Sequence, residues 1–181
     1  MFTILILILV SIIFMSYIII VTPPQKPIEE FGILGAHRGS SVKFVENTLE
    51  AFEDAVNDDK YNFIEFDIQY TKDKVLIVHH DLSLLRLQKK KHKIAELTYD
   101  ELLEISNYHI PTYNETMELV SGKKPLNIEI KSQGDAGDDS EIADFIIKDA
   151  EERGILQETL ISSISQNVIF YINNKYNDLS Q

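Results

Sequence analysis

Two acidic side chains lie two residues apart in an apolar, aromatic stretch of the sequence. Residues 61–70 read Tyr-Asn-Phe-Ile-Glu-Phe-Asp-Ile-Gln-Tyr, a composition that favours a β-strand. Side chains on a strand alternate between its faces, so we expect Glu65 and Asp67 to point the same way. Neighbouring buried carboxylates repel each other unless a cation separates them. A bound Ca²⁺ or Mg²⁺ would remove that repulsion; an acidic strand face in contact with water is the alternative.

Similar chemistry-bearing residues end three other predicted strands. Predicted helices separate most of these strands, which indicates a mostly parallel α/β sheet. Functional groups in such sheets gather at the carboxyl ends of the strands. The residues concerned are His37 and Arg38 after strand 32–36, Glu65 and Asp67 in strand 61–70, His80 and Asp81 after strand 75–79, and Glu129 and Lys131 in strand 125–131.

Capping signals place helices between the strands. A Ser, Thr, Asp or Asn followed three residues later by Glu is typical of a helix start. An acidic loop over residues 134–139 precedes a further helix that ends at Gly154, and a fifth strand over 159–164 precedes the last helix. The predicted starts are Asn47 with Glu50, for a helix to about Asp58, Thr98 with Glu101, and Thr112 with Glu115.

The polar residues belong to short motifs that occur in a fixed order. The motifs are Ala36-His37-Arg38-Gly39, Glu46-Asn47-Thr48, Glu65-Phe66-Asp67, Val78-His79-His80-Asp81, Ile110-Pro111-Thr112, Leu126-Asn127-Ile128-Glu129-Ile130-Lys131 and Ser162-Ser163. In this order they resemble the glycerophosphodiester phosphodiesterase family, whose fold is a (β/α)₈ TIM barrel. The likeness runs from about Gly35 to the C-terminus. Each motif alone is short, and the ordered set carries the resemblance.

The resemblance implies that the protein is an enzyme and that these residues have distinct roles in it. The implied reaction is metal-dependent hydrolysis of a glycerophosphodiester to sn-glycerol 3-phosphate and an alcohol. A cation and basic side chains would stabilise charge on the phosphate, while two imidazoles move protons. The implied roles are His37 and His80 as the acid–base pair, Glu65, Asp67 and Glu129 as ligands of Ca²⁺ or Mg²⁺, and Arg38 and Lys131 as phosphate-binding residues.

The doublet His79-His80 leaves the second histidine open, because alternation along a strand lets only one of them point inward. The family has an apolar residue before its His-Asp pair, which favours His80 and keeps His79 as the fallback. Glu46 is expected to support the site indirectly at most. Asp81 either orients an imidazole or begins the following loop.

The first 21 residues are almost entirely apolar and contain no charged side chain. About 20 apolar residues in a helix match the thickness of a bilayer core, so residues 1–21 predict a single-pass membrane anchor. A cleavable signal peptide is the alternative, but its basic start and small-residue cleavage site are missing. Residues 22–31 form a Pro-rich linker, and residues 32–181 form the phosphodiesterase-like domain. The single lysine of the linker, Lys26, leaves the sidedness of the anchor undefined.

Composition limits the remaining functions. The net charge of −12 argues against nucleic acid as a partner, and the absence of cysteine excludes disulfides and thiolate catalysis. The lysine-rich stretch over residues 89–93 is interpreted as a solvated loop; the alternative is a surface that steers anionic substrates or lipid headgroups.

The length raises a further question, because a complete eight-stranded barrel has about 250 residues. Only about five strand–helix units follow the linker, so we expect either a fragment of a longer product, which we favour, or a truncated protein that associates through open sheet edges. Two other functions stay open. One is a lysophospholipase D or sphingomyelinase D-like lipid phosphodiesterase, and the other is an inactive, membrane-anchored remnant that acts as a binding module.

Overall fold

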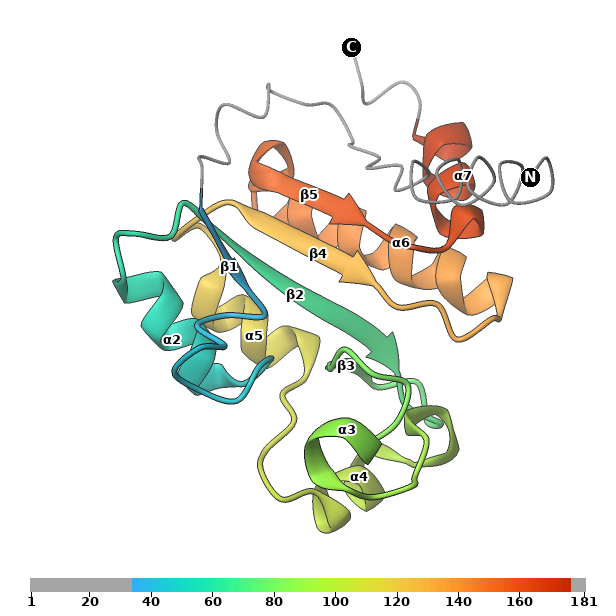
Figure 1. Cartoon of the computed structure of the whole chain (residues 1–181). Helices are drawn as coiled ribbons and strands as arrows, with labels where there is room; N and C mark the ends of the chain where they lie inside the picture. Colours follow the sequence, from blue (N-terminus) through green and yellow to red (C-terminus); the bar gives the residue numbers. More distant parts are fainter. Residues whose placement is uncertain (1–33, 177–181) are drawn as a thin grey trace, which may run out of the picture.

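A computed structural model describes residues 34–176, in which the strands form one sheet (Figure 1). Strands β1, β2, β4 and β5 lie side by side in that order and are parallel, while β3 pairs with β2 in the antiparallel direction. Of the described strands, β1 and β5 therefore form the two edges of the parallel part. The bounds are β1 Gly35–His37, β2 Phe63–Tyr70, β3 Leu76–Val78, β4 Leu126–Ile130 and β5 Thr159–Ser162.

Helices follow the parallel strands in the order expected of repeated strand–helix units. Figure 1 shows α2 and α5 beside the β1–β2 half of the sheet, with α6 behind β4 and β5. The helices are α2 Leu49–Asn57, α3 Leu85–Gln88, α4 Tyr99–Ile105, α5 Tyr113–Val120, α6 Ala136–Glu152 and α7 Gln166–Lys175, with short 3₁₀ turns at Ile94–Glu96 and Leu156–Glu158.

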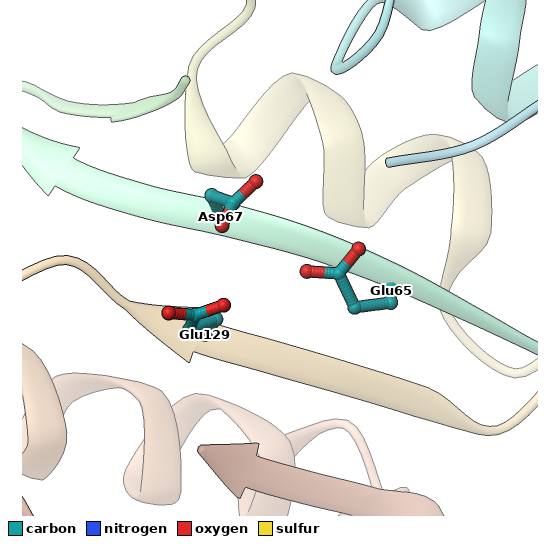
Figure 2. Close-up of side chains that lie close together, drawn as sticks. All are labelled: Glu65, Asp67 and Glu129. Carbon is teal, nitrogen blue, oxygen red and sulfur yellow. The ribbon is translucent and has the colours of Figure 1, made fainter. Parts of the chain in front are cut away.

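The register of the parallel strands sets polar residues next to one another. Asp67 of β2 pairs with Glu129 of β4, and His37 of β1 pairs with Glu65 of β2. Because side chains alternate along each strand, Glu65, Asp67 and Glu129 project from the same face (Figure 2). The predicted clustering of Glu65, Asp67 and Glu129 is confirmed, but Glu65 and Asp67 are the third and fifth of the eight residues of β2 and do not lie at its carboxyl end.

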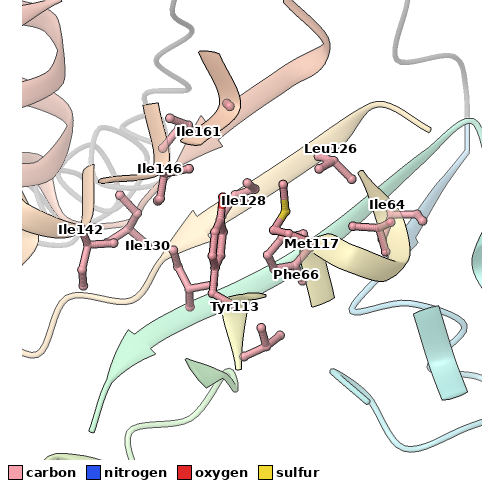
Figure 3. Close-up of a cluster of buried hydrophobic side chains, with 14 of the residues drawn as sticks. Ile64, Phe66, Tyr113, Met117, Leu126, Ile128, Ile130, Ile142, Ile146 and Ile161 are labelled. Atoms are coloured by element: carbon pink, nitrogen blue, oxygen red, sulfur yellow. The ribbon is translucent and has the colours of Figure 1, made fainter. Parts of the chain in front are cut away.

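The opposite face of the sheet carries the main hydrophobic core. In β2 the buried Ile64, Phe66 and Ile68 alternate with the polar residues, and they pack against the helices (Figure 3). Phe66 makes an edge-to-face contact with Phe52 of α2, with ring centroids 5.7 Å apart. Burial of this apolar face is what fixes the register, since a slip of one residue would exchange the two faces.

The strand predicted over residues 75–79 is confirmed as β3, Leu76–Val78, but it is antiparallel to β2 and so does not add to the parallel strands. Residues 71–75 make a tight turn in which the Thr71 amide donates to the Val75 carbonyl over 3.0 Å. Two parallel neighbouring strands need a crossover connection of about a dozen residues or more. A turn as short as this one therefore permits only an antiparallel hairpin. The described chain thus has four parallel strands rather than five. Because β3 folds back along the end of β2, the His79 amide still reaches the Asp67 carbonyl at 2.9 Å.

A smaller hydrophobic core is formed by β3 and by the part of the chain that connects β3 to α5. It stabilises what we call the α3–α4 lobe, residues 79–111, which contains α3 and α4. The lobe is closed by hydrogen bonds between its own loops, from the Leu84 amide to the His92 carbonyl and from the Ile94 amide to the Leu82 carbonyl, both 3.0 Å. Its core consists of Ile77, Leu84, Ile94, Leu102 and Ile110.

Two of the predicted helix starts are confirmed, because Thr98 and Thr112 each form a complete capping box. The third is wrong by one residue: Thr48, not Asn47, caps α2 and accepts a hydrogen bond from the Ala51 amide. The predicted loop over 134–139 is also largely wrong. Asp135 accepts hydrogen bonds from two amides of the next turn, so that α6 begins at Ala136.

Within residues 34–176, no helix is both long and apolar enough to cross a membrane. The anchor predicted over residues 1–21 and the linker over 22–31 lie outside the described residues.

The core makes a stability prediction. Phe66→Ala would remove a fully buried ring on the strand that carries Glu65 and Asp67, and such a change typically costs about 3–5 kcal/mol. Phe170→Ala is the matched control, because that ring is 71% exposed, and its effect should stay within about 0.5 kcal/mol. Urea unfolding followed by circular dichroism measures both. Equal losses in the two variants would contradict the packing described.

Candidate active site

Three carboxylates converge on the polar face of the sheet. Glu65 and Asp67 of β2 and Glu129 of β4 each offer one oxygen atom, and these atoms all lie within 4.8 Å of one another. The first two residues are buried, with 5% and 0% of their surface exposed. Figure 2 shows the three groups on adjacent strands, directed toward a common space.

The neighbouring side chains do not balance all of the negative charge of the three carboxylates. Glu65 Oε1 and Asp67 Oδ1 are buried, and neither has a hydrogen-bond partner among the described residues. Burial, and then the charge of Asp67, raise the pKa of Glu65 to about 8. Unpartnered, buried carboxylate oxygens are costly, and oxygen atoms in this arrangement suit a hard divalent cation. The residues present therefore fit a site for Ca²⁺ or Mg²⁺.

Lys131 supplies part of the missing positive charge. Its Nζ lies 2.7 Å from Glu129 Oε1 and 3.6 Å from Asp67 Oδ1, and the residue is buried. Its ammonium group therefore faces the carboxylates, at the position where positive charge is needed.

Arg38 ties the end of β1 to the same cluster. Its backbone amide donates to Glu65 Oε2 over 2.7 Å, and its Nε lies 3.3 Å from Asp67 Oδ2. The backbone turns sharply here: Arg38 has φ of 58° and Gly39 has φ of 74°. A Cβ atom on Gly39 would come within 2.8 Å of the Ala51 backbone, so only glycine allows this turn to pack against α2.

His37 stands at the open side of the site. Its side chain is 68% exposed, and its Nε2 lies 3.8 Å from Glu65 Oε2. Partial burial, and then the charge of Arg38, lower the pKa of His37 below its ordinary value. The ring is therefore neutral near pH 7 and able to accept a proton.

The two histidines of the doublet have different surroundings. His80 Nδ1 lies 2.6 Å from Asp81 Oδ1, and the charge of His80 is close enough to lower the pKa of His37. His79 is 3% exposed, its Nε2 has no hydrogen-bond partner among the described residues, and burial lowers its pKa. The side chain of His80, rather than that of His79, is thus partly open to solvent and oriented by a carboxylate.

Three residues with contacts in the site were missed or undervalued. Asn47, interpreted from sequence as a cap, is buried, and its Nδ2 donates to Asp67 Oδ2 over 2.9 Å. Glu46 accepts from Arg38 over 2.8 Å, and also binds Arg86 of α3. The positive φ of Asn47, 57°, suits its residue type, but the motif gave no sign of the contact with Asp67. Arg86 carried no sequence signal, because the short helix that holds it was not predicted.

Comparisons with known proteins identify a family and relatives of this chain. The model of the Glycerophosphoryl diester phosphodiesterase family matches residues 37–180. Glycerophosphodiester phosphodiesterase of Bacillus altitudinis is 37% identical over 109 residues, covering 54% of this chain and 44% of the relative. Lysophospholipase D GDPD3 of Homo sapiens is 35% identical over 86 residues, covering 48% of this chain and 24% of the relative.

A solved structure extends the likeness to the fold. The crystal structure of glycerophosphodiester phosphodiesterase from Thermotoga maritima is 33% identical and superimposes with a TM-score of 0.65, covering 80% of this chain and 58% of that one. The fold is therefore the predicted TIM-barrel type of α/β structure, with a parallel sheet. The chain spans less than half the length of the two curated relatives above. The extent of the family match shows that the chain belongs to the glycerophosphoryl diester phosphodiesterase family.

Proposed function

We propose that this protein hydrolyses glycerophosphodiesters to sn-glycerol 3-phosphate and an alcohol, with the help of a bound divalent cation. One observation carries the proposal: Glu65, Asp67 and Glu129 converge within 4.8 Å beside His37 and two basic side chains. The name of the Bacillus altitudinis relative supports the same activity.

The cation would be Ca²⁺ or Mg²⁺, held by Glu65, Asp67 and Glu129. When bound, such an ion supplies positive charge to the phosphate oxygens, where negative charge grows in the transition state. Arg38 and Lys131 add fixed positive charge at the same place, because their basic groups already lie beside the carboxylates.

His37 and His80 are the proposed acid–base pair. One imidazole removes a proton from the attacking hydroxyl, and the other gives a proton to the leaving alkoxide oxygen. His37 suits the first role, because its lowered pKa leaves it neutral near pH 7. His80 suits the second, because Asp81 holds its ring in one orientation through Nδ1 and leaves Nε2 available to the leaving oxygen.

A lysophospholipase D activity is the second candidate. Leu82 and Leu85, which follow His80 closely in the chain, are each 47% exposed, and exposed apolar side chains on the same lobe as His80 would suit an acyl chain. A relative that is 35% identical over 86 residues carries that name. Turnover of lysophosphatidylcholine in preference to glycerophosphocholine would favour this candidate.

Other sequence-based interpretations stay predictions. They are the membrane anchor over residues 1–21, which lies outside the described residues, association through the edges of the sheet, and an inactive remnant that binds phosphodiesters without turnover.

The acid–base assignment makes a kinetic prediction. Purified protein should hydrolyse glycerophosphocholine with Mg²⁺ or Ca²⁺, and a chelator should abolish the reaction. His37→Ala and His80→Ala should each lower kcat by about 10²- to 10⁴-fold, the usual contribution of a general acid or base. Release of sn-glycerol 3-phosphate, measured with a coupled enzyme, gives the rates.

Two further histidines serve as comparisons. His92→Ala changes an exposed loop residue and should leave kcat unaltered, while His79→Gln should lower kcat less than His80→Ala does. A larger loss in the His79 variant, with the fold intact by circular dichroism, would transfer the role to His79. If the wild type shows no metal-dependent turnover of any phosphodiester in a short panel, the enzyme proposal is wrong and the remnant is favoured.

The carboxylate cluster makes a separate prediction about stability. The pKa of Glu65 is about 8 in the folded protein and 4.5 without the fold. The protonated side chain therefore stabilises the folded state fully below pH 4.5, and this stabilisation is lost as the pH rises through about 8. Without metal, Glu65→Gln should therefore melt above the wild type at pH 8, and the gap should shrink toward pH 5. A gain of ~1 kcal/mol corresponds to roughly 2–4 °C in a chain of this size.

Addition of a metal ion gives a second test of the Glu65 carboxylate. Saturating Ca²⁺ or Mg²⁺ should raise the melting temperature of the wild type, since a ligand of the native state stabilises it. Glu65→Gln should lose most of that increase. Glu53→Gln, an exposed change on α2, is the matched control and should keep the wild-type response. An unchanged metal response in Glu65→Gln would remove Glu65 from the cation site.

A further inference from the structure

Arg86 of α3 joins two arms of the active site that come from different parts of the chain. One arm leads to His80: Arg86 Nε donates to Asp81 Oδ2 over 2.6 Å, and Asp81 Oδ1 lies 2.6 Å from His80 Nδ1. Both oxygens of Asp81 are thus engaged, one by the guanidinium and one by the ring. A carboxylate held on both sides keeps one orientation.

The other arm leads to Arg38. Arg86 Nη1 donates to Glu46 Oε2 over 2.9 Å, and Glu46 Oε1 accepts from Arg38 Nη1 over 2.8 Å. Arg38 Nε in turn lies 3.3 Å from Asp67 Oδ2. Arg86 Nη2 also donates to Glu46 Oε1, so two guanidinium groups share Glu46 and both bind that oxygen.

Together the contacts form a continuous series of alternating charges from His80 to the carboxylate cluster. Arg86 is its middle member, and within the series its bond to Glu46 is the step from the α3–α4 lobe to the loop that follows β1. The core of the lobe includes Ile77 of β3, and the Asp67 carbonyl and the Gln69 side chain hold the backbone around His80 to β2, but these contacts involve neither the His80 ring nor Arg38.

We propose that Arg86 is a positioning residue of the active site, which holds His80 through Asp81 and Arg38 through Glu46. This inference rests on the proposed function for its kinetic consequences, but not for its geometry. The planar guanidinium presents donors in a fixed fork, whereas the ammonium of a lysine is a point charge. Only arginine can therefore serve both carboxylates from one side chain with the observed geometry.

The electrostatics of the two carboxylates agree with this role. Burial alone would raise the pKa of Glu46, but hydrogen bonds from Arg86 and Arg38 outweigh it and hold the pKa at about 2. The pKa of Asp81 is likewise lowered, because Arg86 and His80 outweigh the effect of its burial. Both groups are thus ionised over the working pH range and accept hydrogen bonds from their cationic partners.

A test of the geometry does not need turnover. An ionised Asp81 only accepts, so the contact requires a hydrogen on Nδ1 of His80. In ¹⁵N-labelled wild type, the ring nitrogens should report the Nδ1–H tautomer whenever the ring is neutral. Arg86→Ala should give a mixture of the two tautomers, and Arg86→Lys an intermediate result. An unchanged Nδ1–H tautomer in Arg86→Ala would overturn the proposal.

Kinetics test the consequence. Removal of a partner behind a functional group typically costs about 10- to 100-fold, and we expect that loss of kcat in Arg86→Ala, with a rise in KM because Arg38 is also released. Arg86→Lys should recover part of kcat, and millimolar methylguanidinium should restore activity to Arg86→Ala but not to Asp81→Ala. Arg153→Gln is the matched control, because Arg153 pairs with Asp149 on α6 over 2.7 Å and should leave kcat and KM unchanged.

The outcomes separate this inference from the proposed function. If the wild type is active and Arg86→Ala loses no more activity than its unfolded fraction explains, by circular dichroism melting, Arg86 is not a positioning residue. If the wild type is inactive on every phosphodiester, the proposed function fails, and the tautomer measurement alone decides the role of Arg86.

Discussion

The candidate site depends on like charges that the fold holds together on adjacent strands. Parallel pairing of β2 with β4 places Asp67 beside Glu129, and strand alternation adds Glu65 from the same face. Nothing in this arrangement favours folding by itself, because buried carboxylates repel. It is maintained from the other side of the sheet, where Ile64, Phe66 and Ile128 are fully buried against helices. The hydrophobic core thus imposes the register, and the register imposes the electrostatic strain that a cation would relieve.

The groups around the cluster reach it by two different routes. His37 and Arg38 arrive as the end of a parallel strand, the usual way in which such folds assemble sites. His80 arrives on an antiparallel hairpin, β3, that runs back along the last residues of β2. His37 is in register with Glu65, and the His79 amide bonds to the Asp67 carbonyl, so both routes end beside the part of β2 that carries the two acidic residues. The site is therefore built from a repeating scaffold and one local departure from it.

The sequence predicted much of the fold and of the candidate site, because local patterns mark strand faces and helix starts. Strand alternation identified Glu65 and Asp67 as neighbours, and the Thr-x-x-Glu signals located α4 and α5. The strand over 75–79 was predicted without its direction, which follows from the short turn that joins it to β2. Asn47 was misassigned because Asn suits both a helix cap and a left-handed turn, and only contact with Asp67 distinguishes them. Arg86 was missed because its partners, Glu46 and Asp81, are remote from each other in sequence, and no local pattern connects them.

Lys131 gives the acidic cluster a provisional counter-ion of its own. Because its ammonium already lies against Glu129 and near Asp67, part of the negative charge is neutralised within the polypeptide. A cation that bound to the three carboxylates would therefore have to compete with a tethered amine. Its affinity would be lower than the same carboxylates would provide without the lysine.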